Sequence, residues 1–278
     1  MTYSTLAKLS IVIPAYNEEK RIGKTLESYC NFFRTKVRNN EISSYEIIVV
    51  LNNCHDKTLE ITKDLKKKFN EIGIMDLKPG GKGFAITEGF KEILKESTEP
   101  VNYTQSNHLI GFVDADMATP PEAFFDLVKN INNYDGLIAN RWSKKSIIKT
   151  KQTLLRRFVS RGFNVLIRTM FFLTYRDTQC GAKLFKKRVI EKVTPELRLT
   201  EWAFDINLLY LAGKNHFKIK EFPTIWEDKK DSKLNLTKVP VQMFAGILRL
   251  RLIYSPFRRL LKPLKFILKI SDKILRNR

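Results

Sequence analysis

Cysteine and histidine are both scarce in this chain of 278 residues, which contains three of each. Cys30, Cys54 and Cys180 are far apart, form no CxxC pair and are odd in number, which favours a reducing compartment. The three histidines are equally scattered along the chain, so we expect no zinc site.

Long apolar runs are also lacking. No stretch of about 18 uninterrupted apolar residues occurs, so we expect no membrane-spanning helix. The opening MTYSTLAKLS has no charged-then-apolar pattern, so we expect no secretory signal either. At 278 residues, the chain is expected to form one large domain, or one domain with an appendage, around a substantial core, and it contains no internal repeat or low-complexity linker.

Acidic residues are few relative to basic ones: 29 Asp and Glu stand against 50 Lys and Arg, which gives a formal net charge of +21. Such an excess implies an anionic partner, which can be nucleic acid, an anionic membrane surface or a phosphorylated substrate. No RNP-type, KH or zinc-finger signature occurs, so we expect no nucleic-acid partner. A basic nucleic-acid-binding protein stays open as a remote alternative.

Strand and helix patterns alternate through roughly the first 140 residues. This alternation predicts an α/β fold with a doubly wound, mostly parallel, Rossmann-like sheet. The expected strands are 9–16, 46–51, 74–77, the run HLIGFVDAD and 137–140, and the expected helices run from an N-cap at Asn17 to 37, over 56–69 and over 84–95. In the second half we expect a basic helix over 149–175, a turn and strand over 177–185, a helix over 201–214 and a strand over 217–226.

The tail, residues 240–278, contains ten Lys or Arg and one Asp. From residue 257 onward the basic side chains recur about once per helical turn, and apolar side chains take the opposite face. Pro263 should kink or split such a helix. We expect basic amphipathic helices lying on an anionic membrane surface, and a core-packed helix with a basic outer face remains the alternative.

Polar side chains follow three of the expected strands, in AYNEE, NNCHD and the DAD of FVDADMATPP. Asp and Pro favour turns, which is the simplest explanation of the last motif. However, ligands of open α/β sheets bind beyond the carboxyl ends of the strands, where all three polar groups would meet. We therefore favour a site for a metal-bound nucleotide diphosphate over a simple turn.

Four motifs carry a resemblance to a known family. SIVIPAYNEEKRI, EIIVVLNNCHDKT, GGKGFAITEGF and FVDADMATPP resemble, in that order and spacing, the family 2 inverting glycosyltransferases of the GT-A fold. In the second half, RGFNVLIRTMFFLTYRDTQCGAKLF, WAFDINLLYLAG and DSKLNL are similar to the branch that makes dolichyl-phosphate glucose and dolichyl-phosphate mannose, and DTQCGAKLF and WAFD favour the glucose enzymes. The resemblance covers about residues 9 to 254.

The resemblance implies a donor site and a metal site. It assigns Asp116 as the direct ligand of Mg²⁺ or Mn²⁺, with Asp114 beside it contacting the nucleotide, a lysine or the metal, and hard oxygen ligands suit these ions. Some relatives complete the metal site with a Gln where this chain has Ala118, so water or substrate must supply that ligand. The residues that the resemblance places around the nucleotide sugar are Pro14, Tyr16, Asn17, Glu18, Asn52, Lys82, Asp114 and Ala115.

The resemblance also implies contacts to the acceptor and the departing diphosphate. Arg141, Arg156 and Ser160 would bind the acceptor phosphate, and Lys233 would belong to a loop that closes over the donor diphosphate. Asp116, Arg141 and Lys233 are the expected catalytic residues, and each cation could instead be a solvated surface charge. Asp205 in WAFD is read as sugar-binding or structural.

One departure from the family pattern bears on the donor. Relatives usually read VVDDGS where this chain has Leu51 and Asn52 in place of the two acids. An Asn side chain both donates and accepts hydrogen bonds, which matches the edge of uracil, whereas the donor edge of guanine would prefer a carboxylate. The substitution favours a UDP-sugar.

We therefore expect residues 1–239 to form the catalytic domain and 240–278 to form membrane-surface helices. The expected enzyme transfers a hexose, with glucose from UDP-glucose favoured, to dolichyl or polyprenyl phosphate at the cytosolic face of the ER or of a prokaryotic cell membrane. A membrane-anchoring partner or a homo-oligomer would assist attachment. The alternatives are transfer of mannose from GDP-mannose and a hydroxyl acceptor.

Overall fold

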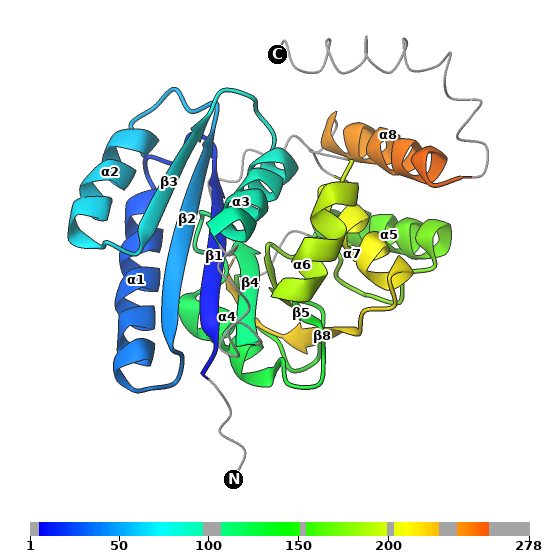
Figure 1. The fold of residues 1–278 in the computed structure, drawn as a ribbon. Coiled ribbons are helices and arrows are strands. Elements are labelled where there is room, and N and C mark those ends of the chain that lie inside the picture. The colour runs from blue at the N-terminus through cyan, green and yellow to red at the C-terminus, as the bar shows by residue number, and fades with distance from the viewer. Residues whose placement is uncertain (1–5, 97–106, 151–153, 199–202, 228–237, 256–278) are drawn as a thin grey trace.

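The computed structural model describes residues 6–96, 107–150, 154–198, 203–227 and 238–255. Its centre is a seven-stranded sheet with the strand order β3-β2-β1-β4-β7-β5-β8 (Figure 1). The strands of this sheet are β1 (Lys8–Ala15), β2 (Ser44–Asn52), β3 (Ile72–Leu77), β4 (His108–Val113), β5 (Gly136–Asn140), β7 (Ala182–Lys186) and β8 (Ile219–Pro223).

The sheet is mostly parallel, as the sequence predicted. β1 pairs in parallel with both β2 and β4, whereas β7 runs antiparallel between β4 and β5. Nearly all of β1, KLSIVIPA, is buried, because helices cover both faces of this central parallel strand and leave neither face exposed to solvent. The parallel order brings the carboxyl ends of β1, β2 and β4 to one edge of the sheet, so the three polar motifs do meet.

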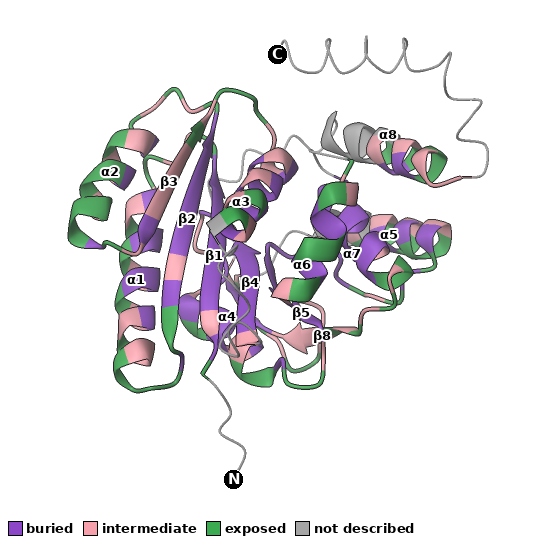
Figure 2. Ribbon diagram, in the orientation of Figure 1, coloured by how far each residue is buried: buried purple, intermediate pink, exposed green. Residues whose placement is uncertain are grey.

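Helices pack on both faces of the sheet and divide the core in two. One apolar cluster lies under α1 and α4, and the other lies under α3, α6 and α7, with α5 and α8 joining it at the edge (Figure 1). The buried positions in Figure 2 follow these two interfaces. The helices are α1 (Ile22–Arg38), α2 (Thr58–Lys68), α3 (Lys82–Glu96), α4 (Pro121–Asn130), α5 (Leu154–Phe171), α6 (Lys187–Val193), α7 (Phe204–Lys214) and α8 (Lys238–Ile253), with a 3₁₀ turn at Thr194–Glu196.

Three details of the expected elements were wrong. The stretch 217–226 is not one strand, because it breaks at Thr224 into β8 and β9 (Ile225–Glu227), and β9 pairs with β6 (Ile147–Thr150) in a separate small sheet. Since β6 ends at Thr150, the expected basic helix over 149–175 starts later, at Leu154, and it also ends earlier, at Phe171. The helix after β1 starts at Ile22 and not after an N-cap at Asn17.

The tail prediction falls largely outside the described residues, which end at Ser255. α8 spans the predicted domain boundary at 239/240, and Ile247 and Leu250 are fully buried in the second core cluster. In the part of the chain that the structure describes, no helix combines the length and the apolar character needed to cross a bilayer.

Candidate active site

Left-handed backbone turns close three strands at the edge where the polar motifs meet. Asn17 follows β1 with φ 53°, Asn53 follows β2 with φ 57°, and Met117 lies beyond β4 with φ 60°. Asn adopts this conformation readily, but for Met it costs free energy, and such strain gathers at functional sites. Each turn reverses the chain directly above the sheet and so keeps the neighbouring polar side chains at its rim.

The turn after β1 is fastened to the start of α2. Asn17 Oδ1 accepts a hydrogen bond from His55 N at 2.9 Å, and Glu18 N donates to Thr58 Oγ1 at 2.8 Å. Asn17 therefore bridges two loops, which is why it does not serve as an N-cap. Tyr16 is 55% exposed at the rim, whereas Pro14 lies within the buried strand.

Glu18 contributes a third carboxylate to this neighbourhood. Burial raises its pKa, and the carboxylates of Asp116 and Asp114 raise it further, while its paired hydrogen bonds with Arg21, both 2.6 Å, lower it. Its titration therefore depends on both aspartates, and the resulting accumulation of negative charge is costly unless a cation is bound.

Asn52, which replaces the second acid of related sequences, is buried at the end of β2. Its Nδ2 donates to Ala15 O at 2.9 Å and its Oδ1 accepts from Gly81 N at 3.1 Å. Gly81 has φ 123°, a conformation that L side chains rarely adopt, so a glycine is required to present this N–H. An aspartate could not donate to Ala15. Base recognition by Asn52 stays a prediction, and it would have to use the remaining N–H and lone pair of the amide.

The DAD loop is held in place by two side chains one turn apart on α1. Thr25 Oγ1 donates to Ala115 O at 2.7 Å, and the Tyr29 hydroxyl donates to Thr119 O at 2.8 Å. Ala115, which the sequence placed at the nucleotide, is only 4% exposed. What α1 fixes is therefore the backbone between the two aspartates and the backbone just after them.

Asp114 and Asp116 lie at the rim with Lys82, the first residue of α3. Lys82 Nζ forms an ion pair with Asp114 Oδ1. Burial alone would lower the pKa of Lys82, but Asp114 and Asp205 raise it above its ordinary value, so the amine is a cation at neutral pH. The sequence predicted that Asp114 would contact an ordered lysine, the nucleotide or the metal, and the structure supplies that lysine.

Asp116 is the less neutralised of the two carboxylates. Burial raises its pKa, and the nearby charge of Asp114 raises it further. Ala118 N donates to Asp116 Oδ1 at 2.9 Å, and this is the one hydrogen bond recorded to that side chain from the described residues. Two carboxylates that repel each other in a partly buried site match the hard oxygen donors preferred by Mg²⁺ and Mn²⁺.

The protein supplies few of the ligands that such an ion would need. Among the described residues, no three or more His, Cys, Asp or Glu side chains gather in a metal-binding arrangement. Ala118 offers no side-chain oxygen, and its carbonyl accepts a hydrogen bond from Glu227 N at 2.9 Å. Phosphate and water oxygens would have to complete the coordination.

Arg141, expected at the acceptor phosphate, forms a buried ion pair. Its Nε and Nη2 each donate to Asp177 at 2.8 Å, and its backbone N donates to the same carboxylate at 2.9 Å. Burial opposes both charges, yet the pair lowers the pKa of Asp177 and raises that of Arg141, so both stay ionised. The guanidinium carbon lies 5.3 Å from the centre of the Trp226 ring. Arg141 is thus held rigidly, with part of its charge already compensated.

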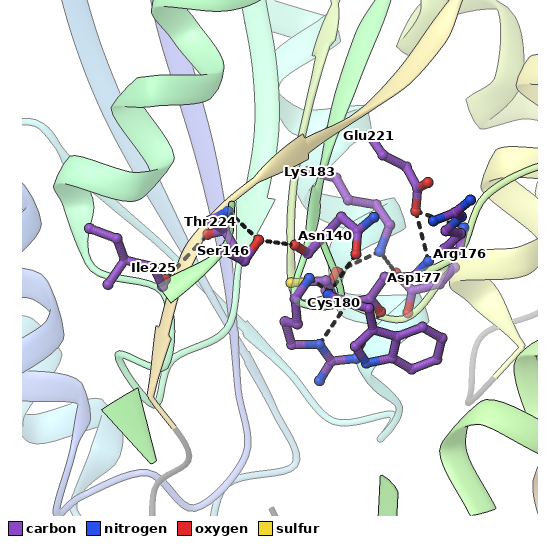
Figure 3. Close-up of polar contacts among 12 residues, drawn as sticks. Asn140, Ser146, Arg176, Asp177, Cys180, Lys183, Glu221, Thr224 and Ile225 are labelled. Carbon is purple, nitrogen blue, oxygen red and sulfur yellow. Dashed lines mark hydrogen bonds and ion pairs between the residues drawn. The ribbon is translucent and has the colours of Figure 1, made fainter. Parts of the chain in front are cut away.

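Sequence reasoning missed three residues of the motif DTQCGAKLF that contact charged groups of the site. They are Asp177, Gly181 and Lys183. Figure 3 shows Asp177, Cys180 and Lys183 in one cluster with Asn140. Lys183 is fully buried, and its Nζ lies 2.5 Å from Asp205 Oδ1 and 2.7 Å from Cys180 O. The available signal was a lysine between the apolar residues Ala182 and Leu184 of β7, because buried lysines are rare unless they are paired.

The remaining predicted acceptor and loop residues are only partly covered. Ser160 lies half-buried on α5. The side chain of Arg156 and the whole of Lys233 lie outside the described residues. Their predicted contacts to phosphate therefore stay predictions.

Comparison with known proteins places this arrangement in context. The family model described as "Glycosyl transferase family 2" matches residues 10–194. The chain is 30% identical over 255 residues to a dolichyl-phosphate beta-glucosyltransferase of Dictyostelium discoideum, covering 88% of this chain and 74% of that protein. It is 27% identical over 261 residues to the human dolichyl-phosphate beta-glucosyltransferase, covering 90% and 77%.

Among solved structures, glucosyl-3-phosphoglycerate synthase of Mycobacterium tuberculosis, crystallised with Mn²⁺, UDP-glucose and phosphoglyceric acid, superposes with a TM-score of 0.61. The match covers 90% of this chain and 81% of that one at 14% identity. At this identity the likeness concerns the fold alone, and it confirms the predicted α/β fold with a mostly parallel sheet, whereas the C-terminal amphipathic helices stay a prediction.

Proposed function

Because the chain belongs to glycosyl transferase family 2 and is a glycosyltransferase, we propose that it transfers glucose from UDP-glucose to dolichyl phosphate or a similar polyprenyl phosphate, with inversion at carbon 1. The observation that carries the proposal is the meeting of Asp114, Asp116 and Lys82 at the carboxyl edge of the sheet. The names of the glucosyltransferase relatives support glucose and the dolichyl acceptor.

The aspartates and Lys82 fit a bound divalent metal ion and the donor diphosphate. When bound, Mg²⁺ or Mn²⁺ neutralises charge on the departing diphosphate, and Asp116 is its proposed ligand, with Asp114 beside it. Lys82 is a cation at neutral pH that already faces one carboxylate, so it is placed to hold a phosphate oxygen as well. Lys82 is held by its ion pair with Asp114, and the backbone between the aspartates is held by Thr25, so these charges are preorganised for electrostatic stabilisation of a transition state.

The acceptor requires little help with proton transfer. A phosphate monoester is already anionic at neutral pH, so it can attack carbon 1 without a strong general base. Asp205, near the position where relatives with hydroxyl acceptors keep a base, is paired with Lys183 in this chain. Catalysis should therefore depend on alignment of the two substrates and on charge neutralisation. Arg141, Arg156 and Ser160 remain the proposed acceptor contacts, and Lys233 the proposed loop cation.

The surface formed by α5 and α8 supports attachment to a membrane from one side. The two helices contact each other, and neither contains an Asp or Glu (Figure 1). Both carry exposed positions (Figure 2). The exposed apolar and basic side chains on and next to these helices include Arg161, Val165, Arg168, Phe172, Phe244, Leu248, Arg251 and Leu252. Apolar and basic side chains on one surface suit an anionic lipid interface, where a long isoprenoid acceptor resides.

A transfer assay with radiolabelled UDP-glucose, dolichyl phosphate and Mn²⁺ tests the function. We expect label in an organic-extractable glycolipid, and no label when the lipid phosphate is omitted. Replacing UDP-glucose with GDP-mannose tests the alternative of mannose transfer. Replacing dolichyl phosphate with an oligosaccharide tests the alternative of a hydroxyl acceptor. A water-soluble product, or transfer from GDP-mannose alone, contradicts the proposal.

Vesicle flotation tests the membrane surface separately. Phe244, Leu248 and Leu252 recur every fourth residue on α8, so Leu248→Glu should weaken binding to anionic vesicles at low salt. The matched control is Ile147→Glu, which introduces the same charge at an exposed apolar position on β6. Equal flotation of the control and the α8 variant would contradict this orientation.

A further inference from the structure

The segment from Asp177 to Lys183, which leads into β7, contacts the charged groups of the site one after another. Asp177 holds Arg141, Gly181 lies against Asp114, and Lys183 holds Asp205. We propose that Gly181 and Lys183 are positioning residues, which fix the carboxylates of Asp114 and Asp205 around Lys82 so that Lys82 and Asp114 are presented together to the donor diphosphate. This inference rests on the proposed function.

Gly181 leaves the space that the Asp114 carboxylate occupies. Its carbonyl accepts a hydrogen bond from Asp114 N at 3.1 Å, where β4 and β7 run antiparallel. A Cβ built on Gly181 would lie 1.9 Å from Asp114 Oδ2 and 2.3 Å from its Cγ, which are impossible separations. The φ angle of Gly181 is not in the left-handed region, so an alanine would meet no backbone strain there. What a side chain at this position displaces is the carboxylate of Asp114.

Lys183 neutralises Asp205 with a buried cation. It has no exposed surface, and its Nζ is bound by Asp205 Oδ1 and by Cys180 O. The two lysines share the ring of Phe112, with Lys183 Nζ at 5.2 Å and Lys82 Nζ at 5.9 Å from its centre. Both ion pairs therefore lie around one aromatic side chain.

The two ion pairs keep the carboxylates of this region from competing for Lys82. Lys82 is within electrostatic reach of Asp114, Asp116 and Asp205. If Asp205 had no cation of its own, Lys82 would be divided between the carboxylates at the donor site and the one on α7. Because Lys183 satisfies Asp205 from below the surface, the half-exposed Lys82 stays with Asp114 at the rim.

A double-mutant cycle tests the role of Gly181. Gly181→Ala should leave the thermal unfolding midpoint nearly unchanged, because the carboxylate at the end of a side chain can rotate away, while Mn²⁺-dependent affinity for UDP falls by at least about tenfold. In an Asp114→Ala background the same substitution should change UDP affinity by less than about twofold, since the displaced group is already absent. Gly213→Ala, where a Cβ meets nothing within 4 Å, is the matched control and should behave like wild type.

Two outcomes overturn the role of Gly181. One is unaltered UDP affinity in Gly181→Ala. The other is that Gly181→Ala lowers UDP affinity equally in the wild-type and Asp114→Ala backgrounds. If Gly181→Ala fails to fold, the Gly181→Ala and Asp114→Ala double variant decides: restored folding supports displacement of the carboxylate, and continued failure contradicts it.

Lys183 is tested by its dependence on Asp205. Lys183→Met should raise the KM for UDP-glucose more than it lowers kcat, because Lys82 is then divided between carboxylates. In an Asp205→Asn background, which has no carboxylate to neutralise, the same substitution should change KM by less than about twofold. An equal effect in both backgrounds overturns the role of Lys183. If the wild-type protein neither binds UDP with Mn²⁺ nor forms glycolipid, the proposed function is wrong. If wild type does both but the Gly181 and Lys183 cycles show no coupling, only the positioning roles are wrong.

Discussion

The two ends of the central strands carry polar side chains with opposite properties. At the amino end, Ser10 on β1 donates to Glu46 Oε1 at 2.5 Å, and His108 Nε2 lies 2.7 Å from the same hydroxyl oxygen. Lys8 completes the group with an ion pair to Glu46 at 3.2 Å. At the carboxyl end of β4, burial raises the pKa of Asp116, and the charge of the neighbouring Asp114 raises it further.

The difference separates a structural cluster from a functional one. The amino-end side chains bind one another, so we expect them to contribute to stability. The carboxyl-end acids have capacity left for a ligand, and their loop includes the left-handed Met117. A binding site is expected where the protein leaves polar groups incompletely satisfied and tolerates strain to do so.

The largest effect should come from Asp116→Ala. We expect the rate of glucosyl transfer to fall by about 10³-fold, since the proposed metal ligand is removed, while the free energy of unfolding stays the same or rises as a buried repulsion is relieved. Transfer assays and urea denaturation measure the two quantities. Asp64→Ala, which removes a carboxylate on the exposed face of α2, should change neither. Retained metal-dependent transfer in Asp116→Ala would show that the metal role is assigned to the wrong residue.

Asp177→Asn should be the most destabilising of the changes considered. Arg141 would keep a buried charge without its counter-ion, which costs about 3 kcal/mol in the free energy of unfolding. The denaturant midpoint should fall while the m-value is unchanged. The exposed pair of Lys67 and Asp64 provides the contrast, because solvent screens it and breaking it should hardly move the denaturant midpoint. If the two losses are equal, Arg141 and Asp177 do not form the buried pair described.

The mostly parallel sheet and the polar rim followed from the sequence because burial on both faces and strand-end motifs are local signals. The buried strand SIVIPA and the DAD motif can each be recognised from a stretch of about ten residues. The partners of the charged groups could not be predicted that way. Asp177 and Arg141 are 36 residues apart, and Lys183 and Asp205 are 22 apart, so only the folded sheet brings them together. The role of Asn52 was likewise hidden, because it depends on where Gly81 places its N–H.

At the amino end, Ser10→Ala should reduce stability without affecting transfer. The substitution leaves the buried His108 and the carboxylate of Glu46 without their shared hydroxyl, at a cost of about 2 kcal/mol in the free energy of unfolding. The kcat of the remaining folded enzyme should equal that of wild type. A drop in kcat with stability unchanged would reverse the assignment of the two ends.

The smallest effect concerns pH and comes from His108. Burial lowers the pKa of His108 to about 4, and the charge of Lys8 lowers it too. The ordinary value of about 6.5 holds in the unfolded chain, which therefore binds more protons at intermediate pH, so stability is lost as pH falls through this window. Between about pH 7 and about pH 5, this group should account for just under 2 kcal/mol of lost stability. His108→Gln keeps an N–H for Ser10 but does not titrate, so it should be less sensitive to acid; an identical pH profile would contradict the buried neutral histidine.

The most direct test of the carboxyl-end site is calorimetric titration of UDP into the protein with and without Mn²⁺, repeated with Asp116→Ala. The account predicts that Mn²⁺ strengthens UDP binding to wild type by at least about tenfold and that Asp116→Ala abolishes this gain. Equal UDP affinity with and without Mn²⁺, or a full metal effect in Asp116→Ala, would contradict it.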